Sequence, residues 1–83
     1  MDRQEIMEKL KEIVISADES LAGKTDGMTE ETKILEDLGI NSVGMLFIAV
    51  MIEETFGIQL NNVYVGSLVR MSDVIDMIAE RLP

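Results

Sequence analysis

The sequence predicts an all-α fold, a bundle of four helices of unequal length. Two segments near the chain ends repeat apolar residues at the helical period. A central apolar segment is bounded by a potential capping residue and by a glycine. No segment alternates apolar and polar residues with comparable strength, as a strand would. The 83 residues suit a single domain with one core.

The first helix is expected to follow Asp2 and to end near Ala17. Asp2 is its expected cap, because a carboxylate accepts from free backbone N–H groups and is favoured at the positive helix end. Charged residues fill the other faces of this amphipathic segment. The apolar positions, at i, i+4, i+7 and i+8, are Ile6, Leu10, Ile13 and Val14.

A long connecting loop is predicted from Asp18 to Lys33, which is rich in Asp, Gly, Thr and Ser and lacks a sustained apolar period. Leu21 and Met28 are the residues expected to hold it against the core. Such a loop is uncommon in a compact domain unless it is functional or contains a short turn of its own. Its acids do not follow calcium-loop spacing, so we expect solvated surface charge.

The second helix is expected from Ser42 to about Phe56. Gly39 permits a turn before it, Asn41 or Ser42 can cap it, and Gly57 supplies the left-handed conformation that ends many helices. At 100° per residue, one side forms the expected core face. That face contains Met45, Ile48, Ala49, Ile52 and Phe56.

Two further helices complete the predicted bundle. The mixed segment from Gln59 to Arg70 is assigned a short third helix, with Asn61 or Asn62 as possible caps. Ser72 is the expected cap of the last helix. Its apolar stripe is expected at Val74, Ile75, Ile78, Ala79 and Leu82.

The composition excludes several classes of function. Sixteen acids against seven bases give a net charge of −9, which repels nucleic acid and favours basic protein partners. The chain has no cysteine and no histidine, which excludes thiolate nucleophiles, the usual zinc sites and a Ser-His-Asp triad. The N-terminus does not resemble a secretory signal, so a cytoplasmic location is expected. The longest apolar run, Val43 to Ile52, is too short to span a membrane, which takes about 20 residues.

Ser42 is the candidate site residue. A serine at the first turn of a helix lies beside unpaired N–H groups and the positive dipole end, which suits a phosphodiester. A simple helix cap is the alternative. The run Gly39 to Gly44 faintly resembles a hydrolase nucleophile elbow, but its first glycine is one place too far and no histidine is present as a base.

The segment DLGINSVGMLFIAVMIEETFGI resembles the acyl carrier protein signature, in which Asp-Leu-Gly-x-Asp-Ser-Leu is followed further along by Phe-Gly-Ile. Glu53 and Glu54 also fall where that family has acids, and Met71 to Ile78 looks like its last helix. The resemblance covers essentially the whole chain. The signature residues matched in type and spacing are Asp37, Leu38, Gly39, Ser42, Phe56, Gly57 and Ile58.

This resemblance implies that residues 1–83 form a single acyl carrier domain, a specialised free-standing member with the family's four-helix bundle. A phosphopantetheinyl transferase would attach 4′-phosphopantetheine from coenzyme A to Ser42. The chain would then be a carrier and not an enzyme, and would deliver thioester-bound acyl groups to acyl-transferring or condensing enzymes of fatty acid, polyketide or related synthesis. A thiol that arrives with the cofactor is compatible with a chain without cysteine. A peptidyl or aminoacyl carrier and an unmodified helical interaction domain are the alternatives.

Two positions near the serine depart from the family pattern. Asn41 stands where Asp is usual and Val43 where Leu is usual. Asn caps a helix as well as Asp does, but one negative charge beside the serine is lost, which affects recognition by a standard transferase.

The outer face of the second helix departs further, because family members mix a few apolar residues with several acids on this main docking surface. Phe47 and Met51 either pack as ordinary core or belong to an exposed apolar docking face. A monomer is expected, with weak self-association through this helix as an alternative. The expected docking residues are Asp37, Asn41, Val43, Leu46, Phe47, Val50, Met51, Glu53 and Glu54.

Overall fold

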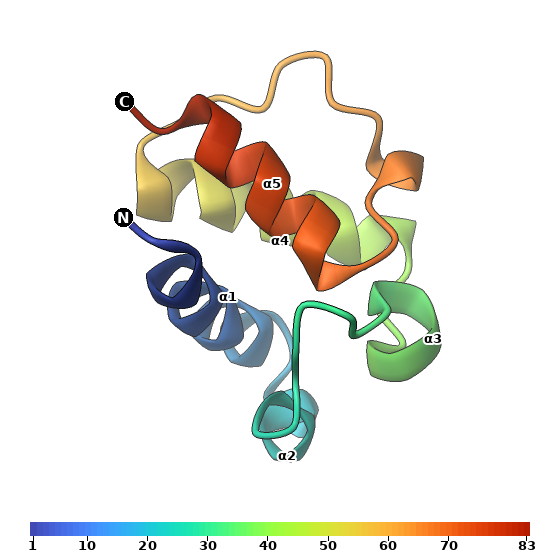
Figure 1. Ribbon diagram of the computed structural model, residues 1–83. Helices are drawn as coiled ribbons and strands as arrows, with labels where there is room; N and C mark the ends of the chain where they lie inside the picture. The colour runs from blue at the N-terminus through green and yellow to red at the C-terminus, as the bar shows by residue number, and fades with distance from the viewer.

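The computed structural model describes residues 1–83 and contains helices but no strands, so the predicted all-α class is confirmed. Nineteen buried apolar residues form one core cluster, to which α1, α4 and α5 contribute most. Figure 1 shows these three long helices, with α2 and α3 lying at one end of them. The elements are α1 (Arg3–Ala17), η1 (Glu19–Leu21), α2 (Ala22–Thr25), α3 (Ile34–Leu38), α4 (Ser42–Phe56), η2 (Val65–Ser67) and α5 (Met71–Arg81).

Helix α1 begins and ends where the sequence predicts. The Asp2 carboxylate accepts from the Glu5 N–H at 2.8 Å, and the Glu5 carboxylate accepts from the Asp2 N–H at 3.5 Å, which completes a capping box. All four predicted apolar residues are buried, and Met7 is buried with them. This apolar face packs against α4 and α5.

The connector between α1 and α4 is more ordered than the predicted loop. Asp18 accepts from the Ser20 N–H at 3.0 Å and from the Ser20 hydroxyl at 2.6 Å, and the 3₁₀ turn η1 follows it directly. Helix α2 comes next, and Leu21 and Met28 are buried as expected. Two short helical pieces therefore account for a connector that is unusually long.

Helix α3 is an element that the sequence interpretation missed, because five residues are too few for a period to be recognised. It ends at Gly39, whose φ of 71° confirms the predicted turn. Backbone pairing holds the chain just before it: the Ile34 N–H donates to the Val69 carbonyl at 2.9 Å, and the Met71 N–H donates to the Thr32 carbonyl at 3.0 Å. The connector is thereby joined to the segment that leads into α5.

The predicted short third helix is present only as the single 3₁₀ turn η2, and the rest of Gln59 to Arg70 is irregular. Neither Asn61 nor Asn62 caps it, and Asn62 has a left-handed φ of 66°, which interrupts a helix. The segment instead runs along the outside of the bundle from the end of α4 to the start of α5, drawn as the long orange connection in Figure 1. Its half-buried apolar residues pack on the core cluster: Leu60, Val63, Val65 and Leu68.

Helix α5 starts at Met71, so Ser72 lies inside the helix and the predicted cap at this residue is wrong. The helix start is stabilised instead by Asp73, a residue of the first turn. Its carboxylate accepts from the Val69 N–H at 3.0 Å and from the Arg70 N–H at 2.9 Å. Of the predicted stripe, Val74, Ile75 and Ile78 are buried, Leu82 is half-buried and Ala79 is exposed. Met71 and Met77 are buried in addition.

Arg3 links α1 to two distant segments. Its guanidinium contacts the Glu30 carboxylate at 2.6 Å and the Asp76 carboxylate at 2.7 Å. The pKa of Glu30 lies below its ordinary value of 4.5, mainly because Arg3 donates hydrogen bonds to its carboxylate. The ion pairs tie the connector and α5 to the start of α1.

This cluster predicts a specific pH dependence. Because the pKa of Glu30 is lowered by folding, its contribution to stability is present above the unfolded value of 4.5 and is lost as pH falls through the folded pKa. Glu30→Gln should therefore be less stable than the unchanged chain at pH 7, and the difference should shrink below pH 4.5. Urea unfolding at a series of pH values measures it. A difference that stays constant into acid would contradict the ion-pair assignment.

Candidate functional site

Ser42 is the first residue of α4 and is exposed to solvent. The cap of this helix is Asn41, whose side-chain oxygen accepts from the Gly44 N–H at 2.9 Å. Of the two capping residues that the sequence allowed, Asn41 therefore has this role. The Ser42 hydroxyl is left free for another function at the positive end of the helix.

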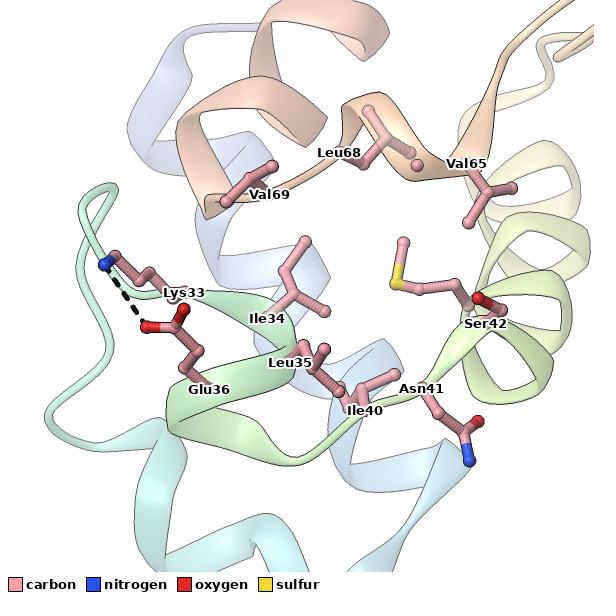
Figure 2. A pocket seen from close by; sticks show the side chains of 12 residues that line it. Lys33, Ile34, Leu35, Glu36, Ile40, Asn41, Ser42, Val65, Leu68 and Val69 are labelled. Carbon is pink, nitrogen blue, oxygen red and sulfur yellow. Dashed lines mark ion pairs between the residues drawn. The ribbon is translucent and has the colours of Figure 1, made fainter.

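A pocket of about 200 Å³ opens beside Ser42. Its walls come from α3, the start of α4 and the segment around η2, and most lining side chains are apolar. Figure 2 shows Ser42 on one side of this pocket, with Val65 and Leu68 on the wall opposite Ile34 and Ile40. The pocket thus offers an apolar wall next to an accessible hydroxyl.

The only titratable groups on the pocket wall form an ion pair with each other. Lys33 Nζ lies 3.2 Å from a carboxylate oxygen of Glu36, and Figure 2 shows this pair at the opposite side of the pocket from Ser42. The groups with shifted pKa values are Arg3, Asp18 and Glu30, and none of them lines the pocket. No side chain here is arranged to take a proton from the serine.

This pocket shares three lining residues, Ile34, Ile40 and Met45, with a small apolar space that Leu10 and Val14 of α1 also line. That inner space measures only about 10 Å³. A separate apolar pocket of about 110 Å³ lies under the segment from Leu60 to Leu68. Met45, Val65 and Leu68 line both the pocket beside Ser42 and this second pocket.

The core face of α4 lies as predicted. Met45, Ile48, Ile52 and Phe56 are buried, and Ala49 is half-buried. Met51 is also half-buried and packs against the core cluster, which agrees in part with the alternative of ordinary core, and its role as a docking residue stays a prediction.

The opposite face of α4 is apolar and exposed. Its members repeat at i, i+3, i+4 and i+7 from the residue after Ser42, so they share one side of the helix. Phe47 belongs to this exposed face and not to the core. The exposed fractions are 75% for Val43, 58% for Leu46, 55% for Phe47 and 53% for Val50. We call these four residues the outer patch.

The acidic and polar residues expected at the docking face have mixed roles. Asp37 is exposed, and its carboxylate accepts from the Lys33 N–H at 2.7 Å. Glu53 is half-buried and accepts from the Leu60 N–H at 2.9 Å, which ties the end of α4 to the following segment. Glu54 is exposed and lies one turn beyond Val50. Asn41 precedes the outer patch and is engaged as the helix cap.

The pocket walls contributed by α3 and η2 were not foreseen from the sequence. Ile40 stands far along the chain from Val65 and Leu68, and the short elements α3 and η2 beside these residues have no recognisable period. Lys33 and Arg70 form an isolated β-bridge. A predicted contact between these two residues would have indicated that the segments around α3 and η2 lie side by side.

No group of three or more His, Cys, Asp or Glu side chains is placed to hold a metal ion. No helix is long and apolar enough to cross a bilayer. A helical bundle with an accessible serine, an apolar pocket beside it and an exposed apolar helix face is typical of a protein that carries a group or docks to partners.

Comparison with known proteins identifies the family. The chain is 30% identical to an acyl carrier protein of Campylobacter hominis over 74 residues, which cover 89% of this chain and 90% of that protein. It is 28% identical to an acyl carrier protein of Thermotoga maritima over 80 residues, which cover 96% and 95%. No family profile matches the sequence. The chain belongs to the acyl carrier protein family.

The fold agrees with this assignment. A solution structure of the apo doublet acyl carrier protein from prodigiosin biosynthesis aligns with a TM-score of 0.63 and 24% identity. The alignment covers 90% of this chain and 37% of that longer chain. The protein is a carrier and not an enzyme, as its relatives are.

Proposed function

We propose that Ser42 carries 4′-phosphopantetheine and that the thiol of this arm holds acyl groups as thioesters. In the loading reaction, the Ser42 oxygen forms a new bond to the phosphorus that bears pantetheine in coenzyme A. The bond from that phosphorus to the nucleotide breaks, and 3′,5′-ADP leaves. The hydroxyl proton passes to the transferase, which supplies the base that this chain lacks.

The free hydroxyl of Ser42 is the observation that carries the proposal. It lies in the family's signature, on the first residue of α4, and Asn41 already provides the cap. A phosphodiester at this position would be favoured by the positive end of a helix of fifteen residues. The residues present therefore fit the group.

An acyl cargo fits the surroundings of the site. The pocket beside Ser42 is mostly apolar and can shelter a hydrocarbon chain from water. Peptidyl carriers are usually less acidic than this chain, whose net charge is −9. Residues 1–83 would then act as one carrier domain that serves acyl-transferring or condensing enzymes of fatty acid, polyketide or related synthesis.

The test is direct. The purified chain is incubated with coenzyme A and a broad-specificity phosphopantetheinyl transferase and is then weighed by mass spectrometry. The expected result is the gain of one phosphopantetheinyl group, located on the peptide that contains Ser42. A chain that gains no mass would be an unmodified helical interaction domain instead.

A further inference from the structure

Met45 lies at the boundary between two apolar pockets. The pocket beside Ser42, which we call the serine pocket, and the second pocket, under the segment from Leu60 to Leu68, share the lining residues Met45, Val65 and Leu68. Met45 also lines the small space toward α1, and it is the one residue common to all three. It stands one helical turn after Ser42 in α4, with 5% of its surface exposed. A chain that passes from the serine pocket into the second pocket therefore meets this side chain.

The two pockets differ in the chemistry that they accept. The serine pocket measures about 200 Å³ and has polar groups on its wall, from Ser42, Asn41 and the Lys33–Glu36 ion pair. The second pocket measures about 110 Å³, and all nine of its lining residues are apolar. A polar group placed there would lose its hydrogen bonds to water without replacement. The second pocket therefore fits only a hydrocarbon chain.

Of the three side chains at the boundary, Met45 is the most easily displaced. Val65 is branched at its β-carbon and Leu68 at the next carbon, so both have few allowed rotamers. Methionine is unbranched, rotates about three bonds and adapts to irregular gaps. Rotation of Met45 opens the boundary without a change in the backbone of α4.

A group bound through Ser42 is held at the edge of the serine pocket (Figure 2). A tether keeps the group at its end at a high effective concentration near the attachment point. A hydrocarbon chain on this tether is removed from water when it enters the serine pocket. The occupant that both pockets fit is therefore an acyl chain, which reaches the serine pocket first.

We propose that Met45 sets the length of the acyl chain that this protein shelters, with short chains in the serine pocket and longer ones admitted only when Met45 is displaced. The inference rests on the proposed function, because the chain in question is the cargo of Ser42. An engineered protein cavity of about 150 Å³ holds benzene, a ring of about six carbons. On that scale the serine pocket holds roughly eight carbons and the second pocket roughly four more. The cargo class is thus a straight acyl group of up to about eight carbons.

The sheltered length has a measurable signature. Each methylene that leaves water for an apolar pocket stabilises the folded state. The melting temperature of the loaded protein should therefore rise with acyl length while the serine pocket fills, by roughly 3 °C or more for each added pair of carbons. The rise should stop at about eight carbons, where Met45 blocks further entry. We call this the plateau length.

The experiment loads the protein from straight-chain acyl-coenzyme A donors, from acetyl to dodecanoyl, with the broad-specificity transferase. The exchange at phosphorus is the one described above, and 3′,5′-ADP again leaves. Circular dichroism follows melting, and each variant is compared with its own acetyl form, so that a general loss of stability cancels. In Met45→Ala the plateau length should move from about eight carbons to about twelve, because the passage is open. Met45→Val removes less of the side chain and gives the same test with a smaller loss of stability.

Met77→Ala is the matched control. Met77 is a methionine of nearly equal burial, 6% exposed against 5% for Met45, and it lines the second pocket but not the serine pocket. Its truncation enlarges the second pocket and leaves the boundary in place. The plateau length should therefore stay at about eight carbons.

Equal plateau lengths in the unchanged chain, Met45→Ala and Met45→Val would overturn the inference while the proposed function stands. A melting temperature that still rises up to dodecanoyl in the unchanged chain would overturn it too, as would one that does not depend on acyl length. A plateau that moves as far in Met77→Ala as in Met45→Ala would mean that total cavity size, and not Met45, sets the length. Failure of the unchanged chain to load at all would instead overturn the proposed function.

Discussion

Ser42→Ala should take up no phosphopantetheine from coenzyme A and should be as stable as the unchanged chain to within about 0.5 kcal/mol. The loss is complete because the proposed phosphodiester requires the Ser42 oxygen, which no neighbouring side chain replaces. Stability is kept because the cap of α4 is the Asn41 side chain, which accepts from the Gly44 N–H at 2.9 Å. Mass spectrometry and urea unfolding of the same sample measure the two quantities.

Asn41→Ala is the matched control, since it changes the neighbouring residue and removes the cap. It should lose about 1 kcal/mol of stability and still load to completion, because the serine hydroxyl remains. If Ser42→Ala gained the same mass as the unchanged chain, the attachment residue would lie elsewhere. If it were destabilised as much as Asn41→Ala, the serine would share the capping role.

The helices that could be predicted from the sequence are those whose ends are marked by a capping residue or a glycine close by in the chain. Helix α1 begins after Asp2, and α4 runs from Ser42 to Phe56 between Asn41 and Gly57, as expected. Caps and left-handed glycines act within a few residues, so their effect is visible in a single segment. The same locality makes Ser42 recognisable as a residue at a helix start.

Elements that depend on distant contacts were not predictable in this way. Helix α3 and the turn η2 are short, and the chain beside them is fixed by pairing across the fold, as between Ile34 and Val69. The start of α5 also depends on backbone bonds from Met71 to Thr32 and from Ser72 to Glu30. A serine in a favourable sequence position was therefore outweighed as a cap by contacts from another segment.

The exposure of the outer patch also could not be predicted from the sequence, because it depends on which other segments cover α4. An apolar helix without a polar face is normally buried, and the sequence left Phe47 and Met51 open between core and surface. In the fold, Met51 packs on the core cluster and Phe47 is 55% exposed. Glu53, one of the expected docking residues, also has a structural role that the sequence did not indicate, because its carboxylate accepts from the Leu60 N–H at 2.9 Å.

Ile75→Ala should have the largest effect on stability, a loss of about 2–5 kcal/mol. Ile75 lies in α5 with 0% exposure, inside the cluster of 19 buried residues. The loss combines the transfer of buried methyl groups back to water with the cavity left among neighbours that relax only in part. Because small proteins are stable by about 5–15 kcal/mol in total, this single change removes much of the margin. Urea unfolding at neutral pH measures it.

Val50→Ala is the control that separates the two apolar faces of α4. Val50 is 53% exposed, so its truncation should cost less than about 1 kcal/mol. An equal loss in Ile75→Ala and Val50→Ala would mean that the outer patch is covered in solution. A large loss for Ile75 and a small one for Val50 would show that apolar residues of this chain serve two separate purposes, the core and the surface beside Ser42.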